Sequence, residues 1–139
     1  MELEHALAFA AGRRAALLTT LRGDGRPQQS VIFYLCEGDR FTISVTATRA
    51  KTKNLRRDPR AALFVPSDDV FVWAGFDGHV ELSDVAQHPD DAVVDRLVDY
   101  YRRANGEHED WAAYRRAMVD DQRLVATFVA TSATGILPG

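Results

Sequence analysis

The stretch RFTISVTA, from Arg40 to Ala47, alternates strictly between apolar and hydroxyl side chains. Successive side chains of a β-strand point to opposite faces, so the alternation predicts a strand with one face in a core and a row of hydroxyls on the other. The apolar face carries Phe41, Ile43 and Val45, and the hydroxyl face carries Thr42, Ser44 and Thr46. Strands of this kind require a sheet with one buried side.

Short turns containing glycine separate this strand from its neighbours. RGDGRP at residues 22–27 and EGD at residues 37–39 are typical of hairpin turns, and they flank strands predicted at 14–21 and 28–36. The strand at 28–36 is largely covered on both faces, as inside a barrel or at a subunit interface. Further strands are predicted at 61–65, at 70–74 and 79–82 around GFDG, and at 123–130 before a final SATGILPG.

The apolar period becomes that of a helix in three places. Residues 3–11 predict a short opening helix, and residues 90–104 and 108–120 predict a helical pair joined by NGEHED. Six or seven strands, mostly in antiparallel hairpins and interrupted by this pair, predict a mainly β, α+β fold that resembles a small barrel. With 139 residues, of which 46% are hydrophobic, the chain is expected to form one domain, residues 1–139.

Charge and motif content argue against several functional classes. The net charge of −3 disfavours general nucleic-acid binding, which requires a broad basic face. A single cysteine, the absence of a secretory pattern and the absence of a spanning apolar run lead us to expect a soluble cytoplasmic protein without a membrane partner. The four histidines are not spaced as ligands, so no metal site is expected. Without a catalytic triad, phosphate loop or dinucleotide motif, any chemistry is expected to come from a bound cofactor.

The stretch TRAKTKNLRRDPR, residues 48–60, concentrates positive charge in an otherwise acidic chain. It has six cationic side chains against one carboxylate, Asp58, and it contains both lysines of the protein. We expect the strand to end near Thr46 and Thr48 and to run into a short helix that stops before Pro59. Free N–H groups at the start of a helix, together with nearby cations, suit a phosphate group.

Within this stretch, Arg49 and Lys51 are expected to face the phosphate, while Lys53 and Arg57 form a solvated face. An alternative stays open, in which the whole stretch is an ordinary solvated basic surface. Its partners would then be the acidic side chains of Asp68, Asp69, Asp90 and Asp91.

Four segments together resemble one known family. TTLRGDGRPQQS, TRAKTKNLRRDPRAALFV, GEHEDWAAYRRAM and the C-terminal GILPG look like the split β-barrel flavin-binding proteins related to pyridoxine 5′-phosphate oxidase. Within this class, the chain is most similar to the actinobacterial group that uses the deazaflavin coenzyme F420. The resemblance runs from about Ala8 to Gly139.

The resemblance implies a homodimer of two split barrels, with one cofactor in each of two grooves at the interface. It implies that Arg49 and Lys51 hold the cofactor phosphate, with Thr52 at the helix start. Hydroxyls on neighbouring strands would line the cofactor chain. These hydroxyls belong to Ser30, Thr46 and Thr48.

The cofactor ring would lie beside the second strand and contact the other subunit. Val31 stands where the family carries a polar amide, and Phe33 is also apolar, so the resemblance implies different ring contacts in this chain. Phe71 and Trp73 would form a wall on the substrate side. Packing in the core or at the dimer interface is an equal alternative for both.

The activity implied is hydride transfer between C5 of reduced coenzyme F420 and a small electron-poor organic acceptor. Two alternatives share the fold: an FMN-binding oxidoreductase, and a cofactor carrier without turnover. A nucleic-acid-binding module that uses residues 49–60 is a further alternative, and its affinity would fall steeply with salt.

Overall fold

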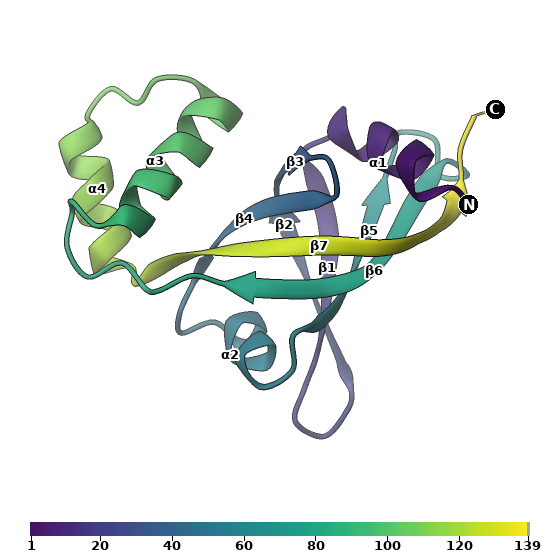
Figure 1. Ribbon diagram of the computed structural model, residues 1–139, viewed down its shortest axis with the longest axis horizontal. Coiled ribbons are helices and arrows are strands. Elements are labelled where there is room, and N and C mark those ends of the chain that lie inside the picture. The colour runs from purple at the N-terminus through teal and green to yellow at the C-terminus, as the bar shows by residue number, and fades with distance from the viewer. Residues whose placement is uncertain (139) are drawn as a thin grey trace.

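The computed structural model describes residues 1–138, which contain one seven-stranded sheet and four helices. The strands are β1 (Ala15–Leu21), β2 (Pro27–Phe33), β3 (Leu35–Glu37), β4 (Arg40–Thr46), β5 (Arg60–Pro66), β6 (Trp73–Leu82) and β7 (Arg123–Ile136). The helices are α1 (Leu3–Ala11), α2 (Ala50–Arg57), α3 (Ala92–Asn105) and α4 (Trp111–Asp120). All strand pairs are antiparallel, in the order β2-β1-β5-β6-β7-β4-β3. The sheet curls, with α1 and α2 near opposite ends and the α3–α4 pair to one side (Figure 1).

The alternation predicted for β4 is confirmed, because its three apolar side chains are all buried in the core enclosed by the sheet. The largest of them, Phe41, contacts the rings of Tyr34, Phe76 and Phe128, with centroids 5.0, 5.3 and 5.7 Å away. Burying an aromatic side chain of this size stabilises a fold by about 1.5–3 kcal/mol. The hydroxyls of β4 face the other way and are half-buried.

The predicted helical pair is confirmed as α3 and α4, and it has a small core of its own. This core packs against Val125 of β7 and is separate from the main core. Its buried helical residues are Val93, Val94, Leu97, Val98 and Met118. No helix in residues 1–138 is long and apolar enough to cross a membrane.

The strand predicted at 28–36 is wrong in one respect, since the chain breaks at Tyr34 into β2 and β3. The Tyr34 side chain is buried, its hydroxyl donates to the Ala10 carbonyl (2.7 Å), and its N–H donates to the Arg14 carbonyl. These bonds turn the chain from one edge of the sheet to the other. β2 therefore pairs with β1, whereas β3 pairs with β4.

The hairpin predicted around GFDG is also wrong, because residues 73–82 form the single continuous strand β6. Residues 70–72 lie in the turn before it. Gly78 sits at a bulge opposite β7, where a Cβ atom would lie only 2.1 Å from the Val129 carbonyl oxygen. Glycine is therefore required here for close backbone approach and not for a turn.

β7 extends beyond the predicted residues 123–130 to Ile136, because β6 continues alongside it as far as Trp73. The extension helps to form an outer sheet face that is apolar at one end. Val31 and Phe33 on β2 are 70% and 67% exposed there, and Ile136 is 57% exposed. The prediction that both faces of the second strand are covered therefore does not hold within one chain.

Candidate functional site

The start of α2 is fixed to the end of β4 by Thr52. Its side chain is fully buried, and its hydroxyl donates to the Thr46 carbonyl over 2.8 Å. The Arg49 N–H donates to the same carbonyl over 3.2 Å. Thr52 thus orients the helix start from inside, while Thr48 and Arg49 are exposed beside it. As predicted, α2 ends before Pro59.

Two backbone N–H groups at the start of α2, those of Ala50 and Lys51, have no hydrogen-bond partner within residues 1–138. No side chain caps this helix end. Unpaired N–H groups and the helix dipole make such an end electropositive. The predicted combination of a helix start and adjacent cations is therefore present.

The basic stretch divides into structural and unpaired side chains. Arg57 is exposed, as predicted, but its side chain also donates to the Asn54 side-chain oxygen (2.9 Å) and to the Leu21 carbonyl (3.2 Å). Arg60 forms an ion pair with Asp58 at 2.8 Å. Lys53 is exposed, as predicted.

Thr46, Thr48 and Arg49 line one cavity of about 630 Å³. They are joined there by Arg123 of β7, which lies opposite Thr46 in the sheet register. Asp120, Asp121 and Gln122 complete the lining. The sequence-based prediction missed Arg123, since the pairing of β4 with β7 is a long-range contact that no local pattern encodes.

Lys51 lies close to these positive charges. Burial, followed by the charges of Arg49 and Arg123, lowers the pKa of the Lys51 ammonium from its ordinary value. Within residues 1–138, none of these three cations forms an ion pair with a carboxylate. These cations are therefore not ion-paired in the described part of the chain, although Asp120 and Asp121 line the same cavity as Arg49 and Arg123.

Ser30 and Val31 point to opposite sides of β2. Ser30 lies opposite Leu18 on the inner face, and its Oγ is buried without a hydrogen-bond partner in the described chain. Val31 lies on the exposed outer face. Trp73 shares that outer face and stacks on Phe64, with ring centroids 5.1 Å apart. Phe71 is exposed on the turn that precedes β6.

Most of the predicted residues therefore form two groups rather than one, and Ser30 and Phe71 belong to neither. Thr46, Thr48, Arg49, Lys51 and Thr52 gather at the start of α2. Val31 and Trp73 border the apolar outer face, where a cavity of about 250 Å³ lies beside Phe64 and Trp73.

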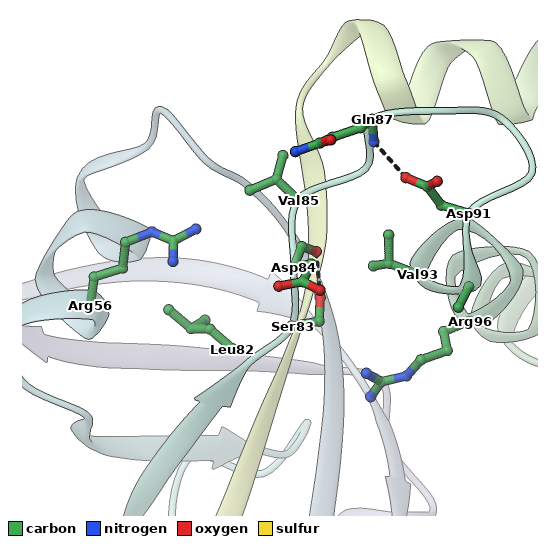
Figure 2. A pocket seen from close by; sticks show the side chains of 10 residues that line it. Arg56, Leu82, Ser83, Asp84, Val85, Gln87, Asp91, Val93 and Arg96 are labelled. Atoms are coloured by element: carbon green, nitrogen blue, oxygen red, sulfur yellow. Dashed lines mark hydrogen bonds between the residues drawn. The ribbon is translucent and has the colours of Figure 1, made fainter.

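A larger cavity of about 820 Å³ lies between α2, the segment after β6 and the start of α3. Figure 2 shows Arg56 and Arg96 at opposite sides of it, with Asp84 between them. The Asp91 carboxylate accepts bonds from the Gln87 and His88 N–H groups, the first of which is the main cause of its lowered pKa. Charges of both signs line this cavity, as they do the cavity at the start of α2. The start of α2 differs in its two backbone N–H groups without a partner in the described chain. Residues 1–138 contain no cluster of three or more His, Cys, Asp or Glu side chains that could hold a metal ion.

The curled sheet, open between its edges β2 and β3, defines the class of split β-barrels with an inserted helical pair. The fold class predicted from the sequence is thereby confirmed. Residues 3–131 match the family model described as pyridoxamine 5′-phosphate oxidase, and the chain belongs to that family.

Solved structures with the same fold differ widely in what their names say. A putative pyridoxamine 5′-phosphate oxidase from Listeria innocua has 19% identity and a TM-score of 0.70, and the match covers 96% of this chain and 97% of that one. An F420 reductase has 23% identity and a TM-score of 0.66, over 96% and 98% of the two chains. HutZ, a heme storage protein from Vibrio cholerae, has 13% identity and a TM-score of 0.69, over 97% and 95%. At these identities the likeness establishes the fold alone.

Proposed function

We propose that this protein binds coenzyme F420 and transfers a hydride between the reduced deazaflavin and a small electron-poor organic acceptor. The observation that carries the proposal is the positive charge of Arg49 and Lys51, which form no ion pair in the described chain, beside two free N–H groups. Family membership supports a flavin-like cofactor, and such cofactors carry a phosphate. Each charge-assisted bond to that phosphate contributes about 1.5–3 kcal/mol.

The polar groups near the site fit a cofactor of this kind. Thr46 and Thr48 line the same cavity as Arg49, and their hydroxyls would contact the polar chain that follows the phosphate. Ser30 belongs to the same proposal but lies apart from this cavity, on the inner face of β2, where its buried Oγ has no partner in the described chain. Leaving such a group unsatisfied costs about 1–3 kcal/mol, which a ligand hydroxyl would offset. Thr52 acts indirectly, by holding α2 on β4.

Two observations support the deazaflavin over FMN. The segments quoted from residues 19–30 and 48–65 resemble the F420-dependent group, and an F420 reductase shares the fold over nearly the whole chain. FMN stays the second candidate, because the family match and the fold of the L. innocua protein suit it equally and the phosphate site would serve either cofactor. The similarity to a heme storage protein favours the third candidate, a carrier without turnover.

The bound deazaflavin would supply the hydride chemistry, and the chain would supply position and a dry surface. Arg49 and Lys51 would anchor one end of the cofactor. Val31 and Trp73 would form the apolar boundary of the ring and the acceptor, with Phe71 at the edge. In this arrangement, the residues at the ring orient the reactants and exclude water without exchanging a proton.

A homodimer belongs to the same proposal. In the sheet register, Val31, Leu17 and Phe64 form one row across the outer face, and Trp73 and Ile136 lie in the next row. A contiguous apolar face of this kind on a soluble protein marks an interaction surface. A second copy would bury it and complete the ring side of each site.

The direct test is titration of the purified protein with coenzyme F420 and with FMN, followed by cofactor absorbance and tryptophan fluorescence. We expect sub-micromolar binding of F420 and at least tenfold weaker binding of FMN, roughly a 1.4 kcal/mol difference. Reoxidation of the reduced deazaflavin by electron-poor acceptors would then be measured in a spectrophotometer.

Each result selects one candidate. Preference for FMN would replace the leading function with the flavin oxidoreductase, and tight binding of F420 without turnover of any acceptor would leave the carrier. Binding of neither cofactor would reject the proposal. Binding of RNA or DNA that falls steeply with salt would instead indicate a nucleic-acid module.

A further inference from the structure

Arg123 is held at the start of α2 by the sheet and by a strained turn. It is the first residue of β7 and pairs with Thr46, the last residue of β4. Figure 1 shows these two strands side by side. The preceding Gln122 has a φ of 53°, which side chains other than glycine rarely adopt. Its carbonyl accepts a bond of 2.9 Å from the Ala47 N–H. The turn therefore fixes where the Arg123 guanidinium emerges.

The guanidinium of Arg123 is poorly satisfied by its own chain. Nη1 makes only long contacts of 3.4 and 3.5 Å with the carbonyl and hydroxyl of Ser44. Nε is buried and has no partner in residues 1–138, a condition shared there only with Ser30 Oγ. A guanidinium carries five donors in a planar fork, and the two donors of Nη2 make no hydrogen bond in the described chain and are free for a ligand.

Within residues 1–138, no carboxylate lies at ion-pair distance from this charge. Asp120 and Asp121 line the same cavity, but neither lies within 4.0 Å of Arg123 as an ion pair in the described chain. Burial raises the pKa values of Tyr100 and Tyr114 more than the charge of Arg123 lowers them. The two phenols therefore remain neutral and do not balance the charge of Arg123. The remaining close charges, Arg49 and Lys51, are positive.

We propose that Arg123 is a third cationic ligand of the anion site, binding the same phosphate group as Arg49 and Lys51. This inference rests on the proposed function to the extent that the ligand carries a phosphate. It extends that function by assigning the site to both strands of the β4–β7 pair, at the end where Thr46 lies opposite Arg123. The fork of Arg123 suits two phosphate oxygens at once, whereas Lys51 acts as a point charge.

The test uses inorganic phosphate as the probe, because phosphate binding does not require the cofactor assignment to be correct. Its affinity would be measured by calorimetry for the parent, Arg123→Gln and the control Arg116→Gln, an exposed arginine on α4 that makes the same change in net charge. Loss of a direct contact should weaken phosphate binding at least about 5-fold for Arg123→Gln. The control should change it less than about 2-fold.

The nuclear magnetic resonance signal of the Lys51 side chain gives a second readout. Removal of the nearby positive charge should raise the pKa of Lys51 in Arg123→Gln and leave it unchanged in Arg116→Gln. If Arg123→Gln does not fold, Arg123→Lys decides, since losing the fork should weaken phosphate binding about 3-fold or more.

Equal phosphate affinity in the parent and in the foldable Arg123 variant would overturn the inference. So would equal losses in the Arg123 and Arg116 variants, or no phosphate binding by the parent at tens of millimolar. A parent that binds phosphate through Arg123 but neither F420 nor FMN would support the inference while rejecting the proposed function.

Discussion

Lys51 and Lys53 lie two residues apart on α2, but they have different surroundings. Lys51 is half-buried next to Arg49 and Arg123, whereas Lys53 is exposed. If the start of α2 binds the cofactor phosphate, Lys51→Ala should weaken the cofactor roughly 10-fold to 150-fold, and Lys53→Ala should weaken it less than about 3-fold. Arg49→Ala should resemble Lys51→Ala. Fluorescence titration of each variant measures the effect.

Thermal melting without cofactor provides the control for these variants. The exposed Arg49 and Lys53 side chains contribute little to folding, so their variants should stay within about 0.5 kcal/mol of the parent. Equal and modest losses of affinity for both lysine variants would indicate a diffuse basic surface, and the site assignment would then be wrong.

The lowered pKa of Lys51 also predicts a dependence of binding on pH. In the free protein, Lys51 begins to lose its proton below the ordinary value of 10.5, and a bound phosphate should oppose that loss. Phosphate affinity should therefore fall as the pH rises toward 10.5, and more gently in Lys51→Arg, which keeps its charge. The same shift makes the unfolded chain hold more protons in this window, so folding stability from this group should rise with pH there. A pH profile of phosphate affinity that is identical in both proteins would contradict the role of Lys51.

For single residues, the sequence predicted where positive charge accumulates. It did not predict which cationic side chains form hydrogen bonds within the chain and which remain free for a ligand. Arg57 and Lys53 look equivalent in the basic stretch, but Arg57 is bonded to Leu21 on a distant strand. Arg123 belongs to the site through its register with Thr46. Both facts depend on long-range strand contacts, which local patterns do not encode.

Among the elements, β6 is where sequence reading failed most clearly, because glycine serves both turns and close packing. Gly78→Ala should destabilise the protein by at least about 2 kcal/mol, since the new methyl would overlap the Val129 carbonyl. Gly23→Ala is the matched control: the nearest atoms to a Cβ there belong to the flexible Arg57 side chain, at 3.6 Å. It should change stability by no more than about 0.5 kcal/mol. Urea unfolding of both variants checks the difference, and equal stabilities would argue against the close approach.

The α3–α4 pair should open more readily than the barrel. Its core is small, and α3 is held to the strands by exposed polar contacts such as Arg103 with Glu37 and Arg14 with the Ala104 carbonyl. Exposed contacts of this type contribute little, because water screens them. Amide exchange followed by mass spectrometry should therefore show faster exchange in α3 and α4 than in β6 and β7. Equal protection would indicate that the pair unfolds only with the barrel.

For the whole molecule, strand and helix periodicity predicted most of the elements, and the family resemblance predicted the split β-barrel that they form within one chain. Alternation in β4 and the helical period of α3 are local signals, so they could be identified directly. The sheet order, with β7 between β4 and β6, is not local. The apolar pattern of β2 was also ambiguous, because a strand that faces a barrel interior and one that faces a second copy have the same composition.

The dimer proposal resolves that ambiguity and can be separated from phosphate binding. Phe33→Asp places a charge on the exposed apolar face, and light scattering should report the variant at the chain mass of 15.5 kDa and the parent at twice this mass. Ala112→Asp, an exposed position on α4, should remain dimeric.

Because Arg49, Lys51 and Arg123 belong to one chain, the Phe33→Asp monomer should bind inorganic phosphate like the parent. It should bind the complete cofactor more weakly, since the ring side requires the second copy. A parent mass of 15.5 kDa would contradict the dimer. A Phe33→Asp monomer that binds the cofactor as tightly as the parent would show that the ring does not bind at the dimer interface.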